Sequence, residues 1–275
     1  MKFHTITPRF ALWAVAMLLT TNLAWSQNPP PASTPPQEQA PAENPDGAQE
    51  IRALLEGLPV GTPGEYERIP GIWQIAIAAG KRNNTAELVE ILDVSLPKPD
   101  QPLYDWQAVV VGGGVINGVS MAGEWPKERL AELFKEHPEL KARWERSIPL
   151  AVKMSHNKEV RDGARYDALR MLGATTYDVG GEHLLKYLKG ENRELQQGAV
   201  SGLVDIDDDR AVQNLIEAFN SLEVRNKAFA FDGLLRSDAR REKLKAAIES
   251  GKIAPDSLTE EQRDQLKKPA ATTPQ

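Results

Sequence analysis

Two serines occupy positions that partly match the nucleophiles of hydrolases. Gly118, Ser120 and Gly123 fall one residue short of the G-x-S-x-G elbow, and the strand that would expose such a serine is missing from the sequence pattern. Ser155 and Lys158 satisfy the S-x-x-K spacing, but the chain contains neither S-D-N nor K-T-G. We therefore predict that the chain has no catalytic residues and is not an enzyme. A hydrolase acting through Ser120 or Ser155 is the alternative.

Three alternating aspartates resemble the start of a calcium-binding loop. Asp205, Asp207 and Asp209 would place oxygen ligands around a hard cation. An EF-hand loop then needs glycine at its sixth position and glutamate at its twelfth, where this chain has Arg210 and Ile216. The sequence therefore favours a turn between two helices, with acidic residues that cap the next helix and interact with its dipole.

Histidines and cysteines are the remaining candidate ligands for a metal or a haem group. Beyond the N-terminal segment the histidines are His137, His156 and His183, and none belongs to an H-E-x-x-H motif or to a pair four residues apart. The chain has no cysteine, which excludes disulfides, thiolate metal sites and covalent c-type haem. We therefore predict no metal site and no cofactor.

A cluster of glycines resembles a dinucleotide-binding loop. Residues 112–114 and Gly118 give the spacing G-x-G-x-x-x-G instead of G-x-G-x-x-G, and no acidic residue follows at the expected distance on a convincing strand. Small residues also allow two helices to approach closely. The sequence therefore favours helix packing for these glycines and predicts no nucleotide-binding residues.

Tryptophans are concentrated in the N-terminal half of the chain beyond the signal-like segment, at Trp73, Trp106, Trp125 and Trp144. Such residues could line a groove that binds a ligand, because aromatic side chains dominate binding hot spots. They are also common core residues, since each buries a large apolar area. Helical apolar stripes favour the core for Trp73 and Trp144, whereas Trp125, next to a proline, is compatible with either place.

The N-terminal segment of the chain resembles a signal peptide for export. Residues 1–26 have a positive start, an apolar stretch and an Ala-Trp-Ser cleavage site, which together predict a signal peptide. The apolar run is shorter than the roughly 20 residues that span a membrane. We predict cleavage before Gln27, export to the periplasm or the extracellular space, and no stable membrane insertion. An uncleaved N-terminal anchor is the alternative.

Composition divides the rest of the chain. Residues 27–50 are rich in proline and polar residues and predict a disordered linker. Apolar residues then recur at helical spacing and almost never alternate, which predicts an all-α fold. We expect degenerate helical repeats over 51–159, clearer repeats over 160–253, and a C-terminal helix with a frayed tail over 254–275.

Individual helices can be placed in the weaker, N-terminal part of this pattern. Apolar stripes and proline positions predict helices that include residues 72–79, 88–92, 103–119, 126–135 and 140–152. Asn84 and Thr85 are candidate caps for the second of these helices. Residues 109–111, three consecutive valines, could alternatively form a buried strand, but the helical neighbours favour a helix.

The C-terminal half contains an internal repeat of 31 residues. Alanine recurs at positions 168, 199 and 230, with leucine four residues later at 172, 203 and 234. A second set of apolar residues, around Leu184 and Leu215, follows with the same period. A helix pair repeated at this period cannot bury its apolar face alone, so neighbouring pairs are expected to stack into an α-solenoid.

The repeat positions carry a family resemblance. Val160 and Arg161 followed by Ala164, with Val224 and Arg225 followed by Ala228, resemble the V-R-x-x-A helix pattern of HEAT repeats, of the short phycobilisome-lyase-like kind. The resemblance covers roughly residues 66–250 and implies a fold made of HEAT-like helix pairs.

The region 232–258 is also similar to the HEAT segment of large secreted planctomycete-type cytochrome c proteins, although this chain lacks C-x-x-C-H and thus the haem site. Some HEAT proteins are hydroxylases that bind iron through His-Glu dipeptides. The order is reversed here at residues 136–137 and 182–183, so the resemblance implies no iron site.

These observations predict a secreted, noncatalytic HEAT-repeat scaffold that mediates a protein-protein interaction. After removal of Lys2 and Arg9 with the signal peptide, 31 Lys and Arg face 39 Asp and Glu, giving a net charge of −8. This balance argues against binding to nucleic acid, which needs a basic surface. The expected partner is a protein of unknown identity. The alternative function, based on the resemblance, is an accessory subunit of an envelope redox or carbohydrate-degrading system.

Overall fold

The computed structural model describes residues 46–57, 63–96, 98 and 105–267, and this part of the chain is all-helical, without a strand. The α-helices are α1 (Gly47–Leu55), α2 (Pro63–Arg82), α3 (Thr85–Ser95), α4 (Asp105–Met121), α5 (Pro126–Glu136), α6 (Pro138–His156), α7 (Asp162–Gly173), α8 (Glu182–Leu188), α9 (Arg193–Asp205), α10 (Asp209–Ala218), α11 (Val224–Leu234), α12 (Asp238–Glu249) and α13 (Glu260–Lys267). Between them lie a short π-helix, η1 (Tyr177–Gly181), and two short 3-10 helices, η2 (Phe219–Ser221) and η3 (Pro255–Ser257). The all-α prediction is confirmed.

The expected signal peptide, the frayed tail beyond residue 267 and all but the last residues of the expected linker lie outside the described residues. The C-terminal boundary of the linker is earlier than predicted, because α1 already begins at Gly47. Asp46 explains the difference, since its carboxylate accepts a hydrogen bond of 2.8 Å from the Gln49 backbone N–H and caps the helix. Among the described helices, none combines the length and apolar character needed to cross a membrane.

Local sequence signals explain where the helices begin. Asn84 caps α3 as predicted, with its side-chain oxygen 3.1 Å from the backbone nitrogen of Glu87. Pro126 and Pro138 occupy the first turns of α5 and α6, where a missing N–H costs nothing. Residues 105–121 form the helix α4, so the prediction of a helix there is confirmed over the alternative strand.

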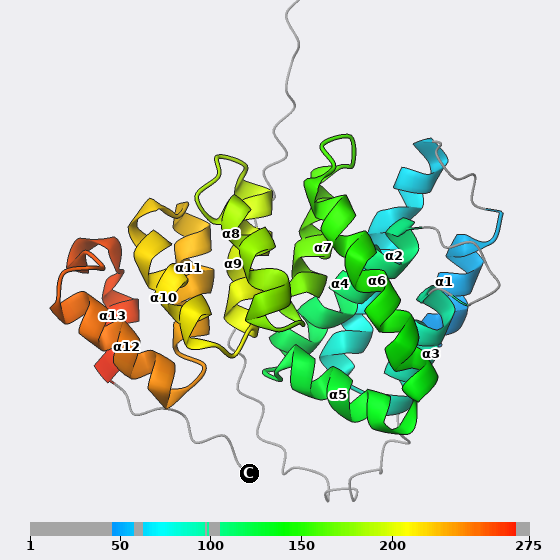
Figure 1. Cartoon of the computed structure of the whole chain (residues 1–275), viewed down its shortest axis with the longest axis horizontal. Helices are drawn as coiled ribbons and strands as arrows, with labels where there is room; N and C mark the ends of the chain where they lie inside the picture. The colour runs from blue at the N-terminus through cyan, green and yellow to red at the C-terminus, as the bar shows by residue number, and fades with distance from the viewer. Residues whose placement is uncertain (1–45, 58–62, 97, 99–104, 268–275) are drawn as a thin grey trace, which may run out of the picture. The chain divides into compact units, whose positions relative to one another are not determined.

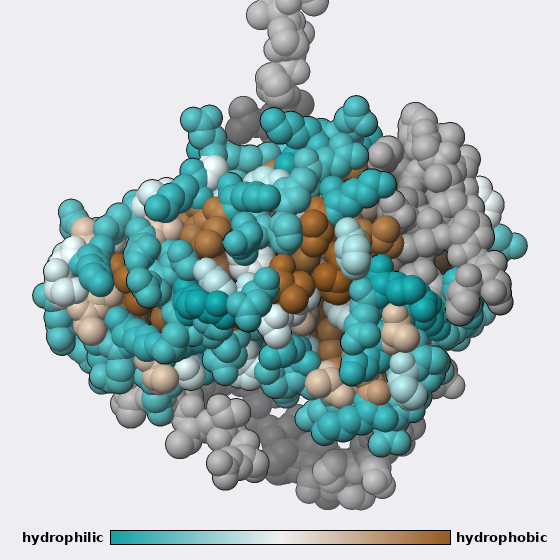
Figure 2. Space-filling view, viewed as in Figure 1, coloured by the Kyte–Doolittle hydropathy of each residue, from teal (hydrophilic) through white to brown (hydrophobic). Residues whose placement is uncertain are grey.

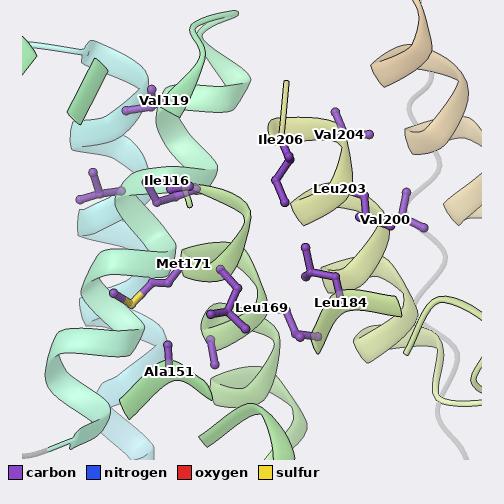
Figure 3. Close-up of a cluster of buried hydrophobic side chains, with 14 of the residues drawn as sticks. Ile116, Val119, Ala151, Leu169, Met171, Leu184, Val200, Leu203, Val204 and Ile206 are labelled. Carbon is purple, nitrogen blue, oxygen red and sulfur yellow. The ribbon is translucent and has the colours of Figure 1, made fainter. Parts of the chain in front are cut away.

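Five helices, α2, α4, α7, α9 and α11, pack against one another in this order, and we call them the central row (Figure 1). The remaining helices pack beside this row: α1 and α3 against α2, α6 against α4 and α7, and α8 and α10 against α9. Buried side chains fill the space between successive helices, as Figure 3 shows for residues of α4, α7, α8 and α9. Elsewhere on the face seen in Figure 2, hydrophilic residues cover most of the surface between separate apolar patches.

Glycines let the helices of the central row approach to backbone contact. A Cβ placed on Gly118 of α4 would lie 2.7 Å from the Gly80 Cα of α2, and one on Gly113 would lie 2.6 Å from the Asp167 carbonyl oxygen of α7. Real Cβ atoms do not approach so closely. The interpretation of the glycine cluster as a helix-packing surface is therefore confirmed.

The 31-residue repeat corresponds to successive helices of the central row. Its alanines and leucines in α7, α9 and α11 are fully buried: Ala168, Ala199, Ala230, Leu172, Leu203 and Leu234. The helix-flanking positions recur with the same period, since Arg161, Asn192 and Glu223 immediately precede these three helices. Leu184 of α8 and Leu215 of α10 are buried as well. The sequence period therefore marks both the core positions and the helix starts.

Candidate functional site

A groove of about 1760 Å³ runs along the central row. Side chains from all five helices of the row line it, together with residues 122–125 after α4, residues 235–237 before α12, and residues of α12. The lining combines aromatic rings with charged groups of both signs, and it includes Trp73, Trp125, Tyr166 and Phe229. Because these rings come from α2, the α4–α5 turn, α7 and α11, a molecule in the groove can contact helices that are far apart in the sequence.

One end of the groove is built around the buried carboxylate of Asp205, the last residue of α9. Asp205 Oδ1 accepts hydrogen bonds of 2.7 Å from Ser120 Oγ and from Arg236 Nη1, and its Oδ2 lies 2.7 Å from Arg170 Nη2. Asp205 is inaccessible to solvent and Arg170 nearly so. We call these four residues the Asp205 cluster. It joins α4, α7, α9 and the α11–α12 turn through one buried charge.

Arg236 also contacts the turn between α4 and α5. Arg236 Nη2 donates a hydrogen bond of 2.6 Å to the backbone carbonyl of Glu124, and its guanidinium lies 4.1 Å from the centre of the Trp125 ring. Arg240 lies over the same ring at 4.6 Å. Burial lowers the pKa of Arg240 to about 10. Trp125 therefore has a binding role, but toward arginines of its own chain.

The groove lining includes a buried acid that is hydrogen-bonded to a tryptophan. Asp167 of α7 is only 3% exposed, and its Oδ1 accepts a hydrogen bond of 2.8 Å from Trp73 Nε1. Within the part of the chain that is described, Asp167 forms no ion pair. Burial raises the pKa of Asp167 well above its usual range, against the opposing effects of the Trp73 hydrogen bond and the charge of Arg170.

Two further acids lie along the groove. Burial raises the pKa of Glu194, and the charge of Asp162 adds to this effect. Burial also raises the pKa of Asp232, with a smaller contribution from Glu261. Tyr166 of α7 also lines the groove; it is buried, and burial raises the pKa of its hydroxyl. The groove is thus a place where carboxyl groups carry protons more readily than in water.

We expect Asp167→Asn to raise the free energy of unfolding at pH 7. Asparagine still accepts the hydrogen bond from Trp73, but it has no charge to desolvate. In the parent the unfolded state releases its Asp167 proton near pH 4 while the folded state retains it, so this group lowers stability as pH rises above about 4. Denaturant titrations at several pH values measure the difference. It should vanish below pH 4 and be absent for the exposed Asp207→Asn; a variant less stable than the parent at pH 7 would contradict it.

A second polar cluster lies away from the groove, between α6 and α8. Tyr187 Oη donates to the Ser155 carbonyl at 2.8 Å and lies 2.9 Å from His156 Nδ1, while His156 Nε2 lies 2.9 Å from His183 Nδ1. Since the tyrosine proton is used on Ser155, the neutral chain of bonds runs from His183 through His156 to Tyr187. Burial, followed by the charges of Lys186, His183 and Arg165, lowers the pKa of His156.

This cluster predicts acid sensitivity. Because the folded state resists protonation of His156 while the unfolded state accepts a proton near pH 6.5, the free energy of unfolding should fall as pH decreases from 7 to 5.5. His156→Gln removes this ionisation and should make the fall shallower over the same interval, although it also removes two hydrogen bonds. Urea titrations at each pH give the slope. An unchanged slope in the variant would contradict the assignment.

The candidate residues of the sequence have structural roles. Ser120 donates to Asp205, and the hydroxyl of the buried Ser155 donates to the Val152 carbonyl at 2.8 Å. The alternating aspartates diverge: Asp205 is buried in its cluster, whereas Asp207 and Asp209 are exposed and contact Arg240 and Lys243. The turn interpretation is confirmed, with Asp208 as the capping residue of α10. Among the described residues no group of three or more acidic, histidine or cysteine side chains could hold a metal.

The sequence predicted the positions of some histidines and tryptophans but not of others. His137 lies at the surface near Glu139, whereas His156 and His183 meet across a separation that the sequence spacing does not indicate. Trp144 belongs to the core as predicted. Trp73 is partly buried and packs against the core, as predicted, and it also lines the groove.

The sequence reasoning missed the groove residues Asp167, Arg170, Glu194 and Arg236. The 31-residue period contains a signal for them, because Arg170, Ser201 and Asp232 are equivalent positions that all line the groove. The period identifies the face of the helices but leaves the chemistry of each position open, since equivalent positions carry a cation, a hydroxyl and an acid.

Comparisons with known proteins assign neither a family nor an activity to the chain. No family model and no curated protein matches the chain. Among solved structures, an engineered protein of the Northeast Structural Genomics Consortium is similar over 79% of this chain and 94% of that chain, with 17% sequence identity and a TM-score of 0.45. The chemistry of the groove therefore depends on its own side chains.

Proposed function

We propose that this chain is an exported, noncatalytic scaffold whose groove binds a segment of a partner protein. In this proposal the signal peptide and the proline-rich linker precede an α-solenoid of HEAT-like helix pairs, and the central row supplies the binding face. The observation that carries the proposal is the groove itself. Its volume of about 1760 Å³ exceeds the roughly 300–1,000 Å³ of typical small-molecule pockets, which favours an extended chain as the ligand.

The lining supports a protein ligand. Tryptophan, tyrosine and arginine are the residues most enriched in protein-protein hot spots, and all three line the groove. Charged groups of both signs surround the rings, as in the rim of a specific interface. The two candidate nucleophiles are engaged in hydrogen bonds with Asp205 and with a backbone carbonyl, which favours binding over catalysis.

Site-specific photocrosslinking tests the proposal. A photoreactive amino acid replaces Phe229, which lines the groove, or, as the matched control, Val179, which is 47% exposed and does not line it. We expect the Phe229 position to crosslink the same partner reproducibly in the native envelope fraction, and the Val179 position to miss it. Equal crosslinking at both positions, or none at Phe229 while the protein is folded, would contradict the proposal.

The identity of the crosslinked partner separates the two functional classes. Recovery of a haem protein or a carbohydrate-active enzyme would favour the accessory role that the family resemblance implies. Recovery of a partner outside these classes would favour a general scaffold.

A further inference from the structure

The charges that line the groove are unequally paired. Arg170 and Arg236 share the single carboxylate of Asp205, and the charge of Arg170 also acts on Asp167. Asp167 and Glu194 lie on the adjacent helices α7 and α9 and form no ion pair within the described part of the chain. Both side chains line the groove, and the helices α7 and α9 that carry them pack against each other. The groove lining therefore includes two acids that form no ion pair within the described part of the chain.

The open oxygen of Asp167 faces the groove. Oδ1 accepts the hydrogen bond from Trp73. Oδ2 has no hydrogen bond among the described residues and keeps some contact with solvent. Asp167 lines the groove, so this oxygen is the part of the carboxyl that a ligand can reach. Asp167 is thus 97% buried and held in place, while one of its carboxylate oxygens can still accept a hydrogen bond from a ligand.

An indole ring is held beside this oxygen. Trp73 lines the groove, and its hydrogen bond to Asp167 fixes the ring next to the carboxyl. An aromatic face attracts cations, and a nearby carboxylate adds a charge-assisted hydrogen bond. Cations of this chain also line the groove. Arg170 and Arg236 are bound to Asp205, the Arg225 guanidinium lies 5.7 Å from the centre of the Phe229 ring, and the others are Lys81, Arg161 and Arg241.

We propose that Asp167, Glu194 and the indole of Trp73 bind a lysine or arginine side chain of the partner segment. This inference rests on the proposed function and names its chemistry: the segment that enters the groove is basic at the position opposite α7 and α9. The cation supplies the partner that the two carboxyls lack, and its hydrocarbon stem packs on the indole.

Binding of a cation is then coupled to a proton. The charged groups that act on Asp167 are Arg170 from its own helix and Glu194 from α9, while α2 and α4 face it with Trp73 and Gly113. Tyr166, on its own helix, is the neighbouring titratable hydroxyl. A cation at Oδ2 stabilises the ionised form, so the protonated carboxyl releases its proton to solvent on binding. The affinity for a basic segment should therefore rise with pH.

Calorimetry with synthetic peptides tests this site. The probes are blocked peptides of equal length in which alanine alternates with lysine, with glutamate or with glutamine. We expect the lysine peptide to bind the purified full-length protein most tightly at low ionic strength, and titrations in buffers of different ionisation enthalpy to show proton release. Asp167→Asn with Glu194→Gln should weaken this binding by about tenfold or more, the effect of losing a charge-assisted hydrogen bond.

The matched control is Glu145→Gln on α6, an exposed acid that does not line the groove. It removes the same charge and should leave the affinity for the lysine peptide within about twofold of the parent. Equal weakening by this control, or preferred binding of the glutamate peptide, would overturn the basic-segment inference. In the second case the groove would still bind a peptide, so the proposed function would survive. Failure of every peptide together with failure of the Phe229 crosslink would contradict both.

Discussion

Asp205→Ala should lower the free energy of unfolding by about 3–5 kcal/mol, because it removes the only carboxylate of a buried ion cluster. Arg170 would remain nearly inaccessible to solvent without its counter-ion, and its Nε and Nη1 already lack hydrogen-bond partners within the described structure. Arg236 and Ser120 would lose the same acceptor. Chemical denaturation monitored by circular dichroism measures the change.

Asp207→Ala is the control for this experiment. Asp207 lies two residues further on, is 71% exposed at its side chain and contacts Arg240 at 3.7 Å. Exposed ion pairs contribute little, so a loss of about 1 kcal/mol or less is expected. If Asp205→Ala cost no more than this control, the cluster would not hold the end of the groove together.

Gly80→Ala should destabilise the protein by about 3 kcal/mol or more, because the added methyl group has no space. A Cβ on Gly80 would lie 2.8 Å from the Gly118 Cα and 2.9 Å from the Val119 backbone nitrogen. These are backbone atoms of α4, so relief requires separation of α2 from α4 rather than a side-chain rotation. The midpoint of thermal or urea unfolding gives the magnitude.

Another glycine of α2, Gly71, has space for a methyl group. A Cβ on Gly71 of α2 would meet only Leu54 Cδ1, at 3.6 Å, an ordinary van der Waals contact. Replacement of a helix-interior glycine by alanine at such a site stabilises by roughly 0.5–1 kcal/mol. We therefore expect Gly71→Ala to be neutral or stabilising. Similar losses for both variants would mean that helix propensity, and not the close contact, decides the outcome.

The fold was accessible from the sequence because its signals are local and periodic. The spacing of the apolar residues predicted the helices, and the 31-residue period predicted which alanines and leucines are buried in α7, α9 and α11. Asn84 could be predicted as a cap because a side chain and a backbone N–H three residues on determine it. The start of α1 was missed, since Asp46 caps a helix within a region whose composition resembles a linker.

The groove could not be predicted from the sequence in the same way. The hydrogen bond between Trp73 and Asp167 joins residues 94 positions apart, and the bond between Ser120 and Asp205 joins residues 85 apart. Neither pair has a motif spacing, because stacking of the central row brings the side chains together. Asp205 illustrates the difference: its sequence context is a run of alternating aspartates, yet burial beside two arginines separates it from its neighbours in function.

The hydrogen bond from Arg236 to the Glu124 carbonyl, across 112 residues, has a consequence for how the molecule comes apart. Arrays of helix pairs ordinarily lose their terminal units one after another, because each unit touches only its neighbours. Here a guanidinium near the C-terminal end of the row is fastened to the turn before α5, so release of α11 and α12 must also disturb that distant turn. We therefore expect the unfolding of α11 and α12 to be coupled to that of the α4–α5 turn.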